Sequence, residues 1–125
     1  MSSYEQLQFL ARFILPTEII DNFDIVEIKE ESKVLHIHLD EQELPPEGYT
    51  KETVTPNGFF PSASVFDFPI RNRKVVLHIR RRRWLEKSTG KSLSRTWEIT
   101  AQGTRYTESF AAFLKGVFGY TPNPR

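Results

Sequence analysis

Apolar residues recur at the spacing of an α-helix at both ends of the chain. Near the N-terminus they predict an amphipathic helix over residues 4–15, ended by Pro16, and a short second helix over residues 17–22. Near the C-terminus they predict an amphipathic helix over residues 107–118, with Thr107 as its N-cap. The apolar positions are Tyr4, Leu7, Leu10, Ala11 and Ile14 in the first helix, and Phe110, Phe113, Leu114, Val117 and Phe118 in the last.

The stretch between these helices has the alternation of β-strands, interrupted by one long loop. Residues 24–29 and 34–40 predict two strands around a turn, and alternate residues of the second strand face the core. Residues 41–58 predict a long loop, because their prolines and glycines break any periodicity. Residues 59–68 predict an extended segment at a sheet edge, where prolines are tolerated, and residues 74–85 predict a further strand.

A β-hairpin follows this last strand. The segment Ser88-Thr89-Gly90 is typical of a three-residue turn with Gly90 in the left-handed conformation. Matching apolar residues across the turn predicts the register of the two strands. That register sets Leu85 opposite Leu93, Arg83 opposite Arg95, Arg81 opposite Trp97 and Arg80 opposite Glu98.

These elements predict the α+β class, with antiparallel strands that include a basic hairpin, an N-terminal helix and a C-terminal amphipathic helix. The length of 125 residues and the 38% hydrophobic content favour a single domain over residues 1–120, with 121–125 as a flexible tail. Cysteine is absent, which excludes disulfides and thiolate metal sites. The N-terminus lacks the features of a signal peptide, and no apolar run is long enough for a membrane span, so we expect a cytoplasmic protein.

The net charge of +1 hides a strong separation of charge along the chain. Residues 1–66 carry 4 Lys/Arg and 12 Asp/Glu, whereas residues 67–125 carry 13 Lys/Arg and 4 Asp/Glu. The basic half includes four consecutive arginines closed by a tryptophan, at residues 80–84. An asymmetry of this size favours a polyanionic partner, and nucleic acid is the commonest one.

The basic hairpin is the predicted contact surface for duplex DNA. A two-stranded ribbon with a cationic tip fits a major groove or straddles the phosphates, and arginine makes bidentate contacts to phosphate and guanine. Arg81 opposite Trp97 predicts a cation–π contact, and Trp84 predicts a flat ring for an unstacked base. The candidate DNA-binding residues are Arg71, Arg73, Lys74, Arg80, Arg81, Arg82, Arg83, Trp84, Lys87, Lys91, Arg95 and Arg105.

Other interpretations of the same residues remain open. The arginines could pair with the acidic half of the same protein, although a strand points them to both of its faces. We expect His36, His38 and His78 to be exposed strand residues rather than metal ligands. The carboxylates between residues 21 and 43 lack the spacing of a two-metal site, and no nucleophile motif, P-loop or dinucleotide fingerprint is present. We therefore expect no catalytic residue, no metal and no cofactor.

Several motifs along nearly the whole chain form an ordered set. They are FL at 9–10, ILP at 14–16, FDI at 23–25, GFFP at 58–61, DFPIRNRKVVLHIRRRRW at 67–84, and GTRYT at 103–107 before the Phe-rich helix. This set resembles the stand-alone N-terminal-region proteins of a bacterial insertion-sequence transposase, the Aon-one family. The resemblance implies a split transposase, whose short DNA-binding protein works with a separate catalytic polypeptide.

In related unsplit transposases, the corresponding region looks like a zinc ribbon followed by a helix-turn-helix. Here Trp84, Leu85 and Leu93 stand where the metal ligands would lie, which implies a zinc-ribbon-like hairpin without zinc. The expected function is therefore recognition of double-stranded insertion-sequence end DNA by a non-catalytic accessory component, and a homodimer is compatible with it. Two alternatives stay open: a module that docks a separate catalytic transposase subunit, and an RNA-binding protein.

Overall fold

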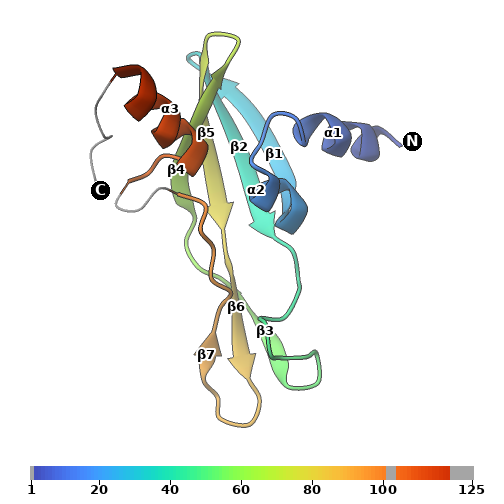
Figure 1. Cartoon of the computed structure of the whole chain (residues 1–125). Coiled ribbons are helices and arrows are strands. Elements are labelled where there is room, and N and C mark those ends of the chain that lie inside the picture. The colour runs from blue at the N-terminus through green and yellow to red at the C-terminus, as the bar shows by residue number, and fades with distance from the viewer. Residues whose placement is uncertain (1, 101–103, 119–125) are drawn as a thin grey trace.

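Two β-sheets of different size lie end to end in this protein, and the helices gather around the larger one (Figure 1). The computed structural model describes residues 2–100 and 104–118. The combination of helices with strands confirms the predicted α+β class. In chain order the elements are α1 (Ser3–Ala11), α2 (Thr17–Asn22), β1 (Phe23–Glu31), β2 (Val34–Glu41), β3 (Val54–Phe59), β4 (Ala63–Ile70), β5 (Arg73–Arg80), β6 (Arg82–Glu86), β7 (Ser92–Leu93) and α3 (Glu108–Phe118).

The larger sheet has four strands in the order β1-β2-β5-β4 and consists of two hairpins laid side by side. Each hairpin turns through two residues with positive φ, namely Ser32 and Lys33 (52° and 61°) and Arg71 and Asn72 (50° and 66°). Two such residues are the signature of a tight hairpin turn that matches the twist of the strands. The hairpins join through β2 and β5, which run parallel, so the sheet adds one parallel pair to the predicted antiparallel strands. The chain leaves the sheet after β2 and forms β3 before it returns, which permits this parallel pairing.

The hydrophobic core lies on one face of the larger sheet, beneath α2 and the end of α1. Phe23, Leu39 and Leu77 are completely buried there, and burying one such side chain contributes roughly 1.5–3 kcal/mol. The chain that follows β7 returns to this core, where Trp97 packs against Phe23 with ring centroids 5.2 Å apart. This packing attaches the segment between β7 and α3 to the larger sheet.

The smaller sheet has three strands in the order β3-β6-β7 and lies beyond the end of β5 (Figure 1). The strand predicted over residues 74–85 is in fact two strands, because the ladder stops at Arg81 and resumes in the other sheet. The predicted loop over residues 41–58 likewise contains the beginning of β3. Its partner β6 supplies the pairing that makes Val54–Phe59 a strand despite Pro56, which sits at an irregularity in the pairing.

The predicted hairpin register is wrong by one residue. Trp84 lies opposite Leu93, and Leu85 lies opposite Ser92. The turn has four residues rather than three, since Glu86 N–H donates to Lys91 O at 2.8 Å. Gly90 has φ of 72°, which confirms its predicted left-handed conformation. The pairing also ends at Leu93, so the residues predicted opposite Arg80–Arg83 do not form a strand.

The helix predictions hold with shorter boundaries. α1 ends at Ala11 rather than residue 15, and α2 occupies the predicted residues 17–22. Thr107 is the predicted N-cap of α3, and its Oγ1 accepts the Phe110 N–H at 3.4 Å. The predicted tail over residues 121–125 lies outside the described residues. None of the described helices combines the length and the apolar character needed to cross a bilayer.

Candidate nucleic-acid interface

The predicted DNA-binding residues are spread along the whole length of the molecule. Arg71, Arg73 and Lys74 lie at the β4–β5 turn, at one end of the larger sheet, whereas Lys87 and Lys91 lie at the β6–β7 turn, at the opposite end of the molecule (Figure 1). The four consecutive arginines span the junction of the two sheets. Arg105 stands in the segment beside β4, where its carbonyl oxygen accepts the Phe66 N–H at 2.7 Å. The fold thus divides the predicted continuous surface into separate groups.

The even-numbered arginines of the run pair with the acidic half of the protein. Arg80 forms a bidentate ion pair with Asp40, with both N···O distances at 2.7 Å. This hydrogen bonding to Asp40 raises the pKa of Arg80 above its ordinary value. Arg82 Nε–H donates to the carbonyl oxygen of Glu41 at 2.9 Å, and its guanidinium lies 3.5 Å from the Glu43 carboxylate. For these two side chains, the interpretation as internal partners of the acidic half is correct.

The odd-numbered arginines have a different environment. The guanidinium groups of Arg81 and Arg83 lie over the ring of Phe60, 4.9 and 5.5 Å from its centroid. Arg83 also donates from Nε to the carbonyl oxygen of Asn57 at 3.1 Å. These contacts orient the two planar guanidinium groups without neutralising their charge. Their outer N–H groups therefore stay available to bind an anion.

Phe59 and Phe60 were not among the predicted site residues, yet they organise the arginine run. The ring of Phe59 lies under Arg80 and Arg82, at 4.0 and 4.5 Å from their guanidinium carbons. The paired aromatics at the end of β3, directly before a proline, were the signal that sequence reasoning could have used. The predicted stacking of Arg81 on Trp97 is wrong, because Arg95 occupies that position at 4.6 Å.

The tip of the smaller sheet is cationic and exposed. Residues 81–95 contain six Lys/Arg and a single acidic residue, Glu86. The Glu86 carboxylate accepts the Thr89 hydroxyl at 2.7 Å. Within residues 2–100 and 104–118, no carboxylate pairs with Arg81, Arg83, Lys87 or Lys91. We call these four residues, which extend from the junction of the two sheets at Arg81 to the β6–β7 turn, the tip surface.

Trp84 is not available to a nucleic acid base, contrary to the prediction. It is only 2% exposed and is the largest of the fully buried side chains. Its indole lies inside the smaller sheet, with Leu93 opposite it on β7 and Pro56 opposite it on β3. Its Nε1–H has no hydrogen-bond partner among the described residues. The side chain therefore serves as the core of the smaller sheet.

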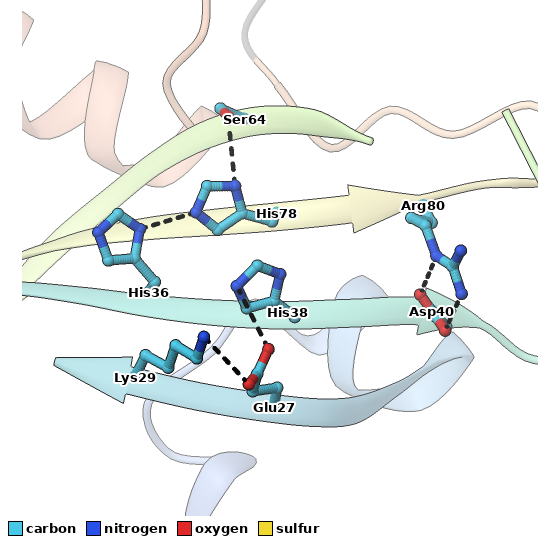
Figure 2. A network of polar contacts seen from close by, with 8 residues as sticks. All are labelled: Glu27, Lys29, His36, His38, Asp40, Ser64, His78 and Arg80. Atoms are coloured by element: carbon cyan, nitrogen blue, oxygen red, sulfur yellow. Dashed lines mark hydrogen bonds and ion pairs between the residues drawn. The ribbon is translucent and has the colours of Figure 1, made fainter. Parts of the chain in front are cut away.

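A second polar cluster lies on the face of the larger sheet opposite the hydrophobic core (Figure 2). It contains all three histidines of the chain, which are half-buried rather than exposed as predicted. His36 Nδ1 and His78 Nε2 share a hydrogen bond of 2.8 Å, and His38 stacks on His78 with ring centroids 4.5 Å apart. Burial and the two neighbouring imidazoles lower the pKa of His78 below its ordinary value.

The geometry of this cluster does not assemble a metal site. Across the described residues, no group of three or more His, Asp or Glu side chains is placed to hold a metal ion. Three of the candidate carboxylates instead pair with cations, namely Asp21 with Arg12 at 2.7 Å, Asp40 with Arg80 and Glu43 with Arg82. Comparison of the chain with protein-family models, curated proteins and solved structures gave no match.

Proposed function

We propose that this protein binds duplex DNA through the tip surface. The observation that carries the proposal is the contrast between the arginines, because Arg80 and Arg82 lie beside the Asp40 and Glu43 carboxylates, whereas Arg81 and Arg83 are held on an aromatic ring without a counter-charge. A narrow β-ribbon with such side chains fits the major groove of B-DNA, which is about 12 Å wide. The fork of each arginine matches a phosphate or a guanine edge.

Motif resemblance supports a more specific role. We propose that the DNA is the end of an insertion sequence, and that the protein is the non-catalytic accessory component of a split transposase that works in the cytoplasm. In this role, a separate catalytic transposase subunit is its protein partner. The support for this role is the ordered set of motifs. Among them, RRRRW at 80–84 contains Arg81 and Arg83 of the tip surface, and GFFP at 58–61 contains the Phe60 ring on which they lie.

The test is a titration of labelled duplex DNA at several salt concentrations. Four neutralised phosphates predict that log K falls with log[salt] at a slope of about −3 to −4. Arg81→Gln combined with Arg83→Gln is expected to reduce the magnitude of that slope by about 2, because each phosphate contact contributes about 1. An affinity that does not respond to salt would contradict the proposal.

A matched control removes the same charge from the other end of the molecule. Arg71→Gln combined with Lys74→Gln takes away two exposed cations at the β4–β5 turn and is expected to leave the salt slope unchanged. If both double variants lowered the affinity for DNA equally, the DNA would be attracted by the charge of the whole protein rather than bound at the tip surface. Tighter binding of RNA than of duplex DNA would favour the RNA-binding alternative instead.

A further inference from the structure

The strand β1 forms an open edge of the larger sheet. The opposite edge, β4, is covered by the segment before α3, since the Thr107 N–H donates to Phe66 O at 2.9 Å. In the described part of the chain, β1 pairs with β2 alone. Its apolar residues Val26 and Ile28 are 55% and 47% exposed. A long edge strand with exposed apolar side chains is a template for pairing with another chain.

The helix α1 projects on this same side of the sheet (Figure 1). Its start is fixed by a capping box between Ser2 and Glu5, but Ala11 is its only buried residue. Its large apolar side chains, among them Phe9 and Leu10 at 56% and 58%, are exposed. A helix of nine residues is marginal in water unless an apolar face packs on a partner. Apart from its end at Ala11, the apolar side chains of α1 lack such a packing surface among the described residues.

We propose that a second copy of this chain pairs with β1 around a two-fold axis at Ile28. Such an axis, perpendicular to the sheet, would join two antiparallel β1 strands and produce a continuous eight-stranded sheet. It sets Ile28 opposite Ile28 and Glu27 opposite Lys29, and by symmetry Lys29 opposite Glu27. Each projecting α1 then lies beside the strands of the other copy, which supply the missing packing surface.

The charges of β1 select this register over its neighbours. A perpendicular two-fold axis brings residues of the same sheet face together, so it passes through a residue rather than between two. Centring on Glu27 would oppose the two Glu27 carboxylates, and centring on Lys29 would oppose two ammonium groups. Opposite charges directly across a strand pair are stabilising and like charges are destabilising. Of these three centres, only Ile28 makes the strand self-complementary.

The experiment is sedimentation velocity of the full chain over a range of concentrations. The unaltered protein is expected to sediment as a dimer. In the symmetric interface, Glu27 of each copy faces Lys29 of the other. Either single substitution, Glu27→Lys or Lys29→Glu, therefore creates two pairs of like charges and is expected to weaken the dimer about tenfold. The double variant, Glu27→Lys with Lys29→Glu, restores opposite charges and is expected to restore the dimer.

Controls separate this proposal from loss of folding and from DNA binding. Glu47→Lys changes an exposed carboxylate in the segment between β2 and β3 and is expected to leave the dimer intact. Each variant is checked for an unchanged thermal unfolding midpoint. Leu7→Gln with Leu10→Gln, on the exposed surface of α1, is expected to weaken the dimer without the charge change. A chain that stays monomeric, or a double charge swap that fails to restore the dimer, would overturn the proposal whatever its affinity for DNA.

Discussion

Neighbouring arginines in this chain differ in how much they contribute to stability. The side chain of Arg80 is 46% exposed and that of Arg82 is 20% exposed. The Glu41 side chain below Arg82 is almost completely buried, and its Oε1 accepts the Arg82 backbone N–H at 2.9 Å. Arg82 therefore bonds Glu41 through both its backbone and its partly buried side chain, whereas Arg80 forms its pair near the solvent.

This difference predicts unequal effects of two alanine substitutions. Arg82→Ala is expected to lower the free energy of unfolding by about 1–3 kcal/mol, because it removes a hydrogen bond to the Glu41 carbonyl and a cation beside the Glu43 carboxylate. Arg80→Ala is expected to cost no more than about 1 kcal/mol, as for other exposed ion pairs. Urea unfolding of both variants measures the difference, and an equal loss would contradict the assignment.

The histidine cluster predicts a dependence of stability on pH. Because the pKa of His78 is lowered from its ordinary value of 6.5, the unfolded chain takes up a proton at a higher pH than the folded protein does. The free energy of unfolding then decreases as the pH falls below about 6.5. The decrease ends once the pH is below the pKa of His78 in the folded protein. Protonation of both His36 and His78 would also remove the acceptor of their 2.8 Å hydrogen bond.

The measurement compares urea unfolding of the protein and of His78→Gln between pH 5 and 8. The difference between the two curves isolates the contribution of this histidine from that of the other titratable groups. The loss of stability toward pH 5 is expected to be smaller in the variant. Parallel pH dependences would show that His78 has the same pKa in the folded and unfolded states.

At the level of the elements, the smaller sheet depends on one side chain. β3, β6 and β7 meet around Trp84, with Val54 the other almost fully buried residue of these strands. A sheet of three short strands has few other apolar contacts to hold it together. The tip surface exists only while this small core is formed.

Trp84→Ala is therefore expected to destabilise the smaller sheet by about 3–5 kcal/mol, the usual cost of removing a buried tryptophan. Trp84→Phe retains most of the apolar volume, and the unsatisfied indole Nε1–H disappears, so its cost is expected to be smaller. Amide hydrogen exchange checks the location, because protection should fall in residues 82–93 before it falls in β2 and β5. Loss of DNA binding by a fully folded Trp84→Phe variant would contradict a purely structural role for this side chain.

At the scale of the whole molecule, the acidic and basic halves of the chain are joined by the pairing of β2 with β5 and of β3 with β6. The end of β2 meets the arginine run at the junction of the sheets, where Asp40 and Glu41 lie beside Arg80 and Arg82. The acidic half thus neutralises Arg80 and Arg82, whereas its carboxylates form no ion pair with the tip surface in the described part of the chain. This arrangement combines a near-zero net charge with a locally cationic end.

The packing of the smaller sheet predicts that the protein folds without a metal. Trp84 and Leu93 lie opposite each other and pack the smaller sheet with apolar side chains. Metal-dependent domains lose structure in chelator because metal binding is part of their folding free energy. The thermal unfolding midpoint is therefore expected to be the same with and without excess chelator. One equivalent of zinc by elemental analysis, or a large drop in the midpoint on chelation, would contradict this expectation.

Local patterns in the sequence determined much of the secondary structure and the separation of charge. Helical spacing identified α2 and α3, alternation identified β1 and β2, and Gly90 marked its turn, because each signal acts over a few neighbouring residues. The GFFP segment and the arginines were visible too, but their stacking was not. Contacts between residues that lie far apart in the chain have no such local signal.

Only the tertiary structure decided the parallel pairing of β2 with β5, the burial of Trp84 and the gathering of the three histidines. It also decided which arginines keep their charge available, since Asp40 reaches Arg80 across 40 residues of sequence. The hairpin register depended on a four-residue turn and on the buried position of Trp84, whereas pairing by hydrophobicity treated Leu85 and Leu93 as the partners. Burial in three dimensions, rather than the alternation along one strand, selected the face that points inward.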